Sequence, residues 1–221
     1  MSGIPDSLAE KILNARSLDG ALPAEPLVPF TNIGDLLNRQ VDRHEQKPFL
    51  IFYDDASGRR EYSYREFYDD VTKAASFLKS AGINPGDRIA TVSFNHSDVV
   101  IQYFAAFLLG AVVVPINVGE DDRRITYILQ NSEVKLAFVR DSYVARISEI
   151  APRVPSLRTI VQTGRVVRPD LPHFRAELAK QAGSFVPAHQ PRFDDDALPK
   201  LLVRDPCAGS KLVCCCHGRL R

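Results

Sequence analysis

Residues 88–117, RIATVSFNHSDVVIQYFAAFLLGAVVVPIN, decide the fold of this chain. The apolar run at 88–93 predicts a strand, and Asn95 is placed to cap a helix that has an acid in its first turn. Gly110 separates this helix from a second, β-branched strand at 111–116. A strand, a helix and a strand in this order predict a parallel crossover, which is the building unit of α/β folds.

The stretch 99–119 has no charged residue, so a membrane span has to be considered. A membrane-spanning helix needs about 20 predominantly apolar residues. Gln102, Gly110 and Pro115 interrupt this stretch, and it divides at Gly110 into a buried helix and a strand. We therefore expect no membrane span.

Segments nearer the amino terminus predict a helix and a hairpin. In 32–44 the apolar residues fall on one helical face, and Asn32 is a good N-cap for that helix. The short apolar run at 48–54 predicts a buried strand. The alternating residues 60–64 predict its antiparallel partner, so that the two strands form a hairpin.

A capping box starts the next helix, because Ser63 is followed three residues later by Glu66. Behind it, apolar residues recur every three or four positions as far as Gly82, which ends the helix. The later elements expected are helices at 120–130, 141–150 (capped by Asp141) and 174–180, and strands at 134–139 and 159–162. The whole pattern predicts an α/β fold with a mostly parallel sheet, flanking helices and an N-terminal β-hairpin.

The charge of the chain is balanced, with 28 Lys and Arg against 27 Asp and Glu and a formal net charge of +1. No basic patch with interleaved aromatic residues is present, which argues against a nucleic acid partner. Residues 1–10 carry acids and no apolar run, so they do not resemble a secretory signal. We expect a cytoplasmic protein.

The sequence contains none of the short motifs typical of a phosphate loop, a dinucleotide site or a hydrolase nucleophile. His44, His96 and His173 are isolated, and we interpret them as hydrogen-bonded surface or capping residues. Three aspartate pairs are interpreted as solvated turn or helix-start residues, because adjacent side chains point apart. These pairs are Asp54 and Asp55, Asp69 and Asp70, and Asp121 and Asp122. We assign no catalytic, cofactor-binding or metal-binding residue.

The last stretch differs in composition from the rest. All four cysteines lie within 207–216, and residues 197–221 carry five basic residues against one acid. Cysteines 214–216 and His217 are possible metal ligands, but structural zinc sites need two to four residues between cysteines. The acidic run 194–196 suits a hard cation, although a solvated loop is the simpler interpretation. We expect no metal site here.

Three segments give the ordered part of the chain a family resemblance. Residues 62–67 (YSYREF) resemble a T-Y-x-E-L helix entry, residues 81–90 (AGINPGDRIA) a G-[LIV]-x-x-G-D-x-V-A turn into a strand, and residues 109–117 (LGAVVVPIN) a G-A-x-x-x-P-[LIV]-[ND] segment. All three patterns occur, in this order, in the N-terminal region of the adenylate-forming (ANL) superfamily. Residues 31–141 therefore resemble the start of an acyl-CoA synthetase.

The resemblance implies an ATP-dependent carboxylate–CoA ligase. Such enzymes use ATP and Mg²⁺ to convert a small carboxylic acid into an acyl adenylate, and then transfer the acyl group to coenzyme A. In the family, the residues that hold ATP follow this N-terminal region and begin with a Ser/Thr/Gly-rich phosphate loop. The acyl substrate is left open between fatty, aryl and other small carboxylates.

The sequence departs from the family where that loop is expected. Residues 194–198 resemble the approach to it, but the basic, cysteine-rich tail follows. We therefore divide the chain into an extension (1–30), a partial AMP-binding domain (31–198) and an aberrant tail (199–221), which we expect to be disordered. A shifted reading frame, a retained intron or a misassembled gene would explain the tail.

The resulting expectation is an incomplete N-terminal subdomain of an adenylating enzyme, inactive alone and without sites for ATP, Mg²⁺ or CoA. Apart from free-standing catalysis, which we do not expect, two alternatives remain. One is a non-catalytic module that binds and regulates a full-length homologue, because an incomplete domain exposes an apolar face. The other is a metal-binding protein that uses the cysteine-rich tail.

Overall fold

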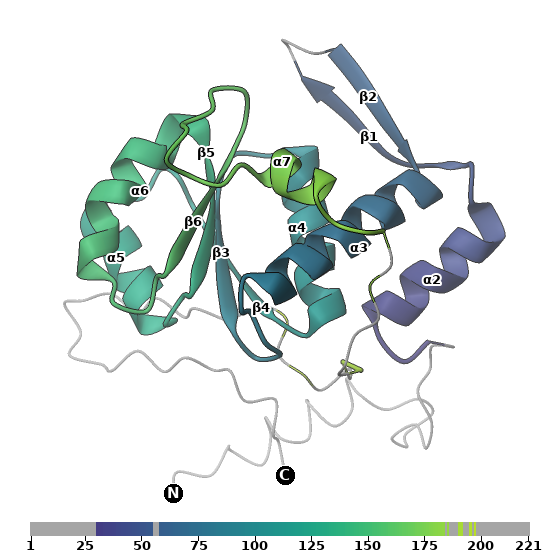
Figure 1. Ribbon diagram of the computed structural model, residues 1–221, viewed down its shortest axis with the longest axis horizontal. Coiled ribbons are helices and arrows are strands. Elements are labelled where there is room, and N and C mark those ends of the chain that lie inside the picture. The colour runs from purple at the N-terminus through teal and green to yellow at the C-terminus, as the bar shows by residue number, and fades with distance from the viewer. Residues whose placement is uncertain are drawn as a thin grey trace, which may run out of the picture. The chain divides into compact units, whose positions relative to one another are not determined.

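The computed structural model describes residues 30–54 and 58–183, together with Phe185, Gln190, Pro191, Asp195 and Ala197. From Asn32 onward these residues belong to one compact unit (Figure 1). The expectations for residues 1–29, for the tail 199–221 with its cysteines and His217, and for most of the acidic run 194–196 fall outside the described residues.

A four-stranded parallel sheet forms the centre of this unit. It consists of β3 (Arg88–Val92), β4 (Val112–Ile116), β5 (Leu136–Arg140) and β6 (Thr159–Thr163) in the spatial order β4-β3-β5-β6. All three neighbouring pairs are parallel. The parallel sheet predicted from the sequence is therefore confirmed.

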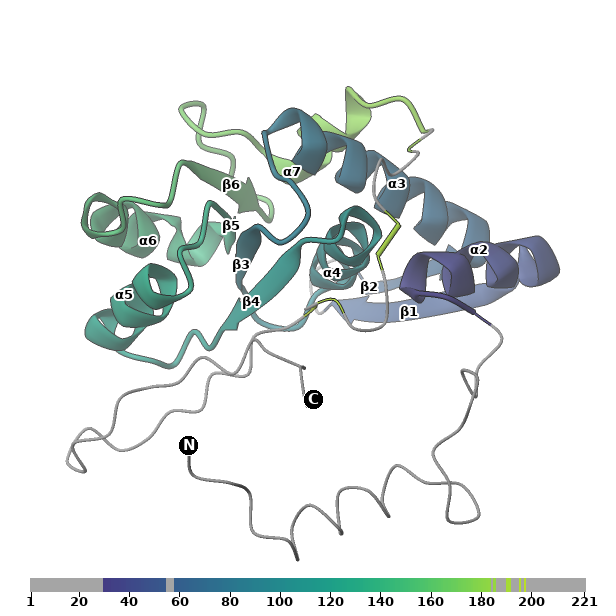
Figure 2. The ribbon, with the colours of Figure 1, turned by 90° about the horizontal axis from the view of Figure 1, so that it is seen from below.

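Helices cover both faces of the sheet, as Figures 1 and 2 show. One face packs against α3 (Tyr64–Ser80), α4 (Ser97–Leu109) and α7 (Phe174–Ala179), and α2 (Ile33–His44) packs in turn against α3 and α4. The other face packs against α5 (Asp122–Asn131) and α6 (Val144–Ile150). Alternate residues of each strand belong to the two cores: Ile89 and Phe138 to the first, Ala90 and Val139 to the second. This two-sided burial is typical of a parallel sheet.

The crossover from β3 to β4 follows the prediction except at its cap. Gly110 has a left-handed backbone (φ +80°) and ends α4, so that the uncharged stretch divides there. The predicted cap, Asn95, is wrong. His96 is the N-cap, because its extended backbone directs Nδ1 to the amide of Asp98.

The hairpin forms as predicted but is not buried as predicted. β1 (Pro48–Asp54) pairs antiparallel with β2 (Gly58–Ser63) as a separate two-stranded sheet. Ile51 is 46% exposed and Tyr53 is 71% exposed. Only one side of β1 meets the helical layer, where Phe49 packs on Phe67 with ring centroids 4.5 Å apart. A two-stranded sheet with one covered side leaves its other side in solvent.

The capping box between β2 and α3 is confirmed. The Ser63 hydroxyl accepts from the Glu66 amide at 3.2 Å, and the Glu66 carboxylate accepts from the Ser63 amide at 2.8 Å. These two bonds satisfy amides that the first turn of a helix leaves without partners. The hairpin therefore ends at Ser63, and α3 begins at Tyr64.

The remaining elements agree with the prediction apart from one helix start. Asp141 does not cap an α-helix: it begins a 3₁₀ turn (Asp141–Tyr143) that precedes α6. Its side chain is directed elsewhere, as shown below. Among the described residues, no helix is both long and apolar enough to cross a bilayer.

Candidate functional site

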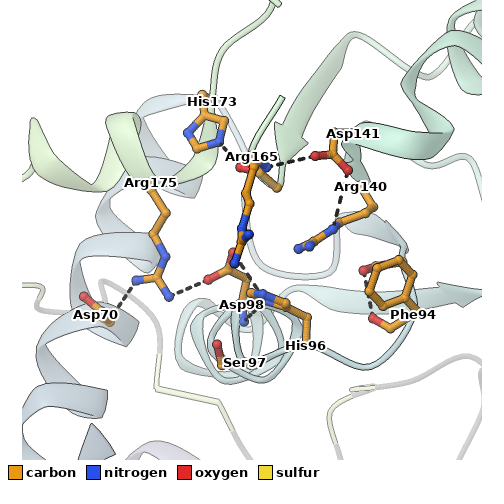
Figure 3. A network of polar contacts seen from close by, with 12 residues as sticks. Asp70, Phe94, His96, Ser97, Asp98, Arg140, Asp141, Arg165, His173 and Arg175 are labelled. Carbon is orange, nitrogen blue, oxygen red and sulfur yellow. Dashed lines mark hydrogen bonds and ion pairs between the residues drawn. The ribbon is translucent and has the colours of Figure 1, made fainter. Parts of the chain in front are cut away.

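The parallel strands end together at one edge of the sheet, and the direction of the crossovers reverses there. From β3 the chain crosses to β4 on one side, whereas from β5 it crosses to β6 on the other. The carboxyl ends of β3 and β5 therefore form a topological switch point, where open α/β sheets bind ligands. We name the five side chains that gather there the carboxyl-edge site: Phe94, His96, Arg140, Asp141 and Arg165 (Figure 3).

Beside this site, Arg175 of α7 is the centre of an ion-pair network. Its Nη1 atom donates to the Asp70 carboxylate of α3 at 2.6 Å, and its Nη2 atom donates to the Tyr62 hydroxyl of β2 at 2.9 Å. Nη2 also forms an ion pair with Asp98 at the start of α4 (Figure 3). The side chain therefore joins α7 to α3, α4 and the hairpin.

The charges of this network stabilise one another. Burial by itself would lower the pKa of Arg175, but Asp98, Tyr62 and Asp70 raise it above the ordinary value. The guanidinium therefore keeps its proton, and the two carboxylates remain matched by it. The network can hold elements in place, but Arg175 cannot transfer a proton in a reaction.

His96 joins the start of α4 to the hairpin. Its Nδ1 atom accepts from the Asp98 amide at 3.1 Å and lies 3.5 Å from the Asp98 Oδ2 atom. The imidazole ring packs against Phe52 of β1, with centroids 4.7 Å apart. The prediction that this histidine is a capping residue is confirmed.

The Asp141 carboxylate binds the loop that follows β6. It accepts hydrogen bonds from the amides of Ser142 at 2.8 Å, Arg165 at 2.8 Å and Val166 at 3.0 Å. Burial by itself would raise the pKa of Asp141, but these amides, together with Arg140, hold it below its ordinary value. The carboxylate is therefore ionised in the folded protein and fixes the loop.

Gly164 makes that approach possible. Its φ is +108°, and a Cβ atom there would lie 2.4 Å from the Asp141 Oδ2 atom. Only glycine has both the backbone freedom and the space for this position. The Gly164 carbonyl accepts from His173 Nε2 at 2.9 Å, so His173 is a hydrogen-bonded residue of the same loop, as predicted.

Arg140 completes the site from the end of β5. Its side chain is 10% exposed. Its guanidinium carbon lies 4.9 Å from the centroid of the Phe94 ring, a cation–π contact. Its Nε atom lies 3.6 Å from Asp141 Oδ1, which is an ion-pair distance but too long for a hydrogen bond.

Several residues considered at the sequence level have different surroundings from those expected. Asp70 is not simply solvated, because it pairs with Arg175. Asp121 accepts from the Arg124 amide at 2.7 Å and caps α5, which confirms a helix-start role. His44 has a buried Nδ1 atom for which the described residues supply no hydrogen-bond partner, and its ring lies 5.8 Å from that of Tyr64. The pair Asp54 and Asp55 lies where side chains are not described.

Within residues 30–54 and 58–183, no three His, Cys, Asp or Glu side chains are placed to hold a metal ion. The sequence also has no glycine-rich phosphate loop.

Sequence patterns did not identify the residues that meet at the carboxyl edge. Phe94, the adjacent pair Arg140 and Asp141, and Arg165 belong to three separate segments of the chain, and no short motif contains them all. The available signal was topological: a polar residue directly after a buried parallel strand lies at the carboxyl edge of the sheet. Arg140 and Asp141 after LAFV fit that description.

Comparison with known proteins gives a consistent family. Residues 37–202 match the family of AMP-binding enzymes. A 3-oxocholest-4-en-26-oate–CoA ligase of Rhodococcus rhodochrous is 25% identical over 59% of this chain and 22% of its own length. A crotonobetaine/carnitine–CoA ligase of Salmonella arizonae is 28% identical over 80% of this chain and 35% of its own length. The chain therefore spans a fifth to about a third of these relatives.

Solved structures show the same fold. The structure of an anthranilate CoA ligase with anthranoyl-AMP superimposes with a TM-score of 0.71 at 23% identity, over 79% of this chain and 33% of that one. An acyl-CoA synthetase of Brucella canis gives a TM-score of 0.70 at 17% identity, over 83% and 33% of the two chains. At these identities the likeness concerns the fold.

Proposed function

The chain belongs to the family of AMP-binding enzymes, and from this membership we propose that it supplies the amino-terminal part of an ATP-dependent carboxylate–CoA ligase. The reaction of the whole enzyme is activation of a small carboxylic acid to an acyl adenylate, followed by thioester formation with CoA. The whole enzyme would use Mg²⁺ as its cofactor and would consume ATP and CoA as co-substrates. The observation that carries the proposal is the family match over residues 37–202.

The names of the relatives support the ligase class within that family. The Rhodococcus and Salmonella relatives are both named as CoA ligases of carboxylic acids. The described carboxyl edge contributes framework rather than chemistry, because the donors of Arg175 and the carboxylate of Asp141 bind neighbouring protein groups. We propose that the 221-residue chain is inactive by itself and that a longer product carries the ATP-binding residues.

The test combines gene sequencing with an activity measurement. The DNA that follows the codon for Leu198 is translated in all three frames, and a Ser/Thr/Gly-rich phosphate loop is expected in another frame. The longer product is then assayed for carboxylate-dependent exchange of labelled pyrophosphate into ATP, beside the 221-residue chain as control. Exchange by the longer product alone is expected. Exchange by the short chain refutes its inactivity, and absence of the loop from every frame refutes the frameshift.

A second candidate function is a non-catalytic module that binds a full-length synthetase. Large apolar side chains at the protein surface favour it: Ile51 and Tyr53 on the hairpin and Val166 on the loop after β6 are each more than 45% exposed. Co-expression with a tagged full-length synthetase tests this candidate. Recovery of both chains in one peak supports the module, and loss of recovery on Tyr53→Ser would locate the contact. Recovery of the short chain only as aggregate contradicts it.

A further inference from the structure

The two strands of the hairpin differ in how their outer edges are protected. An edge strand presents N–H and C=O groups that can pair with another chain, and native proteins protect such edges with charged side chains, prolines or a covering element. On β2, Arg59, Arg60 and Glu61 are consecutive, charged and exposed. The outer edge of β2 is therefore protected.

The outer edge of β1 has no such protection. Residues 49–53 (FLIFY) contain neither a charge nor a proline, and aromatic and β-branched residues favour strands. From Leu50 to Asp54 the strand is in regular register with β2, and within the described residues no strand pairs with its other side. Figure 1 shows the hairpin extending beyond the helices. An uncharged edge in such a position is a site for pairing with another strand.

A second copy of β1 matches this edge. In an antiparallel pair with its two-fold axis at Phe52, Ile51 lies opposite Tyr53 of the partner subunit. These side chains are 46% and 71% exposed in the single chain, and a β-branched residue opposite an aromatic one stabilises antiparallel strands. The two copies of Asp54 lie at opposite ends of the pair, so like charges do not meet.

We propose that β1 pairs edge to edge with β1 of a second copy of this chain, which gives one antiparallel sheet with the strand order β2-β1-β1-β2. Such a sheet has four strands, whereas an isolated two-stranded hairpin is marginal in water. Both copies use the same edge, so the pairing is closed, and the charged edges of β2 at both ends oppose the addition of further strands. The proposal rests on the hairpin alone and is independent of the proposed function.

The pair should be weak. One short strand from each copy is a small contact beside the roughly 1,600 Å² buried in a standard protein–protein interface. Dimers should therefore form at high protein concentration, whereas the dilute samples used to measure unfolding should contain monomers.

Analytical ultracentrifugation of the full 221-residue chain tests the assembly. A reducing agent is included, so that the four cysteines within 207–216 do not cross-link two chains. A reversible change from monomer to dimer with rising protein concentration is expected. Monomers at every concentration overturn the proposal, and growth beyond the dimer overturns the closed pairing.

Amide hydrogen exchange of the wild-type chain, compared between dilute and concentrated samples, locates the contact. In the dimer, exchange should slow at alternate residues of β1, namely those whose N–H groups point away from β2. Amides at the outer edge of β2 should be unchanged. Slower exchange on β2 alone, or on neither strand, overturns the proposal, and this measurement does not depend on the folding of any variant.

One variant and its matched control separate the edge from a general effect of charge. Ile51→Lys should raise the dissociation constant of the dimer about tenfold or more, because a lysine on an edge strand opposes pairing. Val167→Lys adds the same charge on the loop after β6, at a side chain that is 56% exposed, and should leave the constant unchanged. Equal dissociation constants for Ile51→Lys and wild type, or equal weakening by both variants, overturn the proposal.

Discussion

β5 and β1 are both short apolar strands, but the protein encloses one and leaves the other half exposed. Every residue of β5 is buried, and its side chains enter the cores on both faces of the sheet. In β1, Phe49 packs on the helical layer while Tyr53 is 71% exposed. An apolar run therefore predicts a strand, whereas its burial depends on how many layers the topology places around it.

The parallel sheet and the hairpin also differ in the contacts that hold them in place. β5 has strands on both sides, β3 and β6, and helices on both faces. The hairpin has no third strand in the described chain, and isolated two-stranded hairpins are marginal in water. Its attachment includes rings against the helices, the bond from Arg175 to Tyr62, and a hydrogen bond between the Tyr62 and Ser97 hydroxyls. We expect the sheet to control global stability and the hairpin to respond locally.

The largest expected effect is a core truncation in β5. Phe138 is 1% exposed and packs edge-on against Phe174 with centroids 5.2 Å apart. Phe138→Ala should lower the free energy of unfolding by about 3–5 kcal/mol, through lost burial and an added cavity. Urea denaturation followed by circular dichroism measures it.

The matched substitution in the hairpin is Tyr53→Ala. It removes a side chain of similar size from a strand of similar composition, but one that is 71% exposed. Its effect should stay within about 0.5 kcal/mol. A loss equal to that of Phe138→Ala would contradict the comparison and show that the hairpin is covered in solution.

The next effect concerns the residue that joins the two regions. Arg175→Met leaves Asp98, which is 5% exposed, and Asp70 without their cation. We expect a loss of about 3 kcal/mol, because an uncompensated buried charge remains. Amide hydrogen exchange in β2 should accelerate as well, since Tyr62 loses its donor.

Two further variants separate charge from packing at this position. Arg175→Met combined with Asp98→Asn should recover part of the stability, because the buried carboxylate is gone. Arg168→Met removes an exposed pair with Asp170 and should leave the stability essentially unchanged. If the double variant were no more stable than Arg175→Met, uncompensated charge would not be the cause.

A smaller effect is expected at the junction of the hairpin and α3. Ser63→Ala removes the hydroxyl that accepts from the Glu66 amide and should destabilise the protein by about 1 kcal/mol. Ser63→Asp retains an acceptor and should preserve most of the stability. Thermal unfolding of the two variants in parallel checks this, and equal destabilisation by both would argue against the cap.

Helix caps and helix ends were predictable from the sequence where all the residues involved lie within a few positions of one another. The capping box of Ser63 and Glu66 and the division of the uncharged stretch at Gly110 were found in this way. The cap of α4 was missed, because the usual preference for asparagine favoured Asn95 over His96. The His96 ring also packs against Phe52 of the hairpin, a contact that the local sequence does not indicate.

The candidate site and the ion-pair network beside it were not predictable, because residues far apart in the sequence form them. Arg175 meets Asp70 across 105 positions of sequence. Single-sequence patterns contain no information on such pairs. Asp141 was expected to cap a helix, because aspartate is a common N-cap and a helical pattern follows it. In the structure, Gly164 allows the loop amides to come close enough to bind the Asp141 carboxylate instead. The order of the strands in the sheet determines which of these residues lie close together.

The smallest effect is a difference in acid sensitivity between the two regions. Asp141 has a lowered pKa in the folded protein, although burial by itself would raise it, because loop amides and Arg140 favour the carboxylate. A folded-state pKa below the unfolded value contributes stability above the unfolded pKa, near pH 4, and this contribution is lost as pH falls through the folded pKa. Asp141→Asn should therefore lose less stability than wild type between about pH 4 and pH 2.

The variant should also be less stable than wild type near neutral pH, since it lacks the charge that the loop amides bind. Tyr53→Ala leaves every carboxylate in place and should keep the wild-type dependence on pH. Urea denaturation at a series of pH values measures all three proteins. An unchanged slope in Asp141→Asn would mean that the carboxylate is not held in its ionised form by the loop, and that acid acts on the sheet elsewhere. Asp87, which binds Lys135 at 2.6 Å and also has a lowered pKa, would then be the next residue to test.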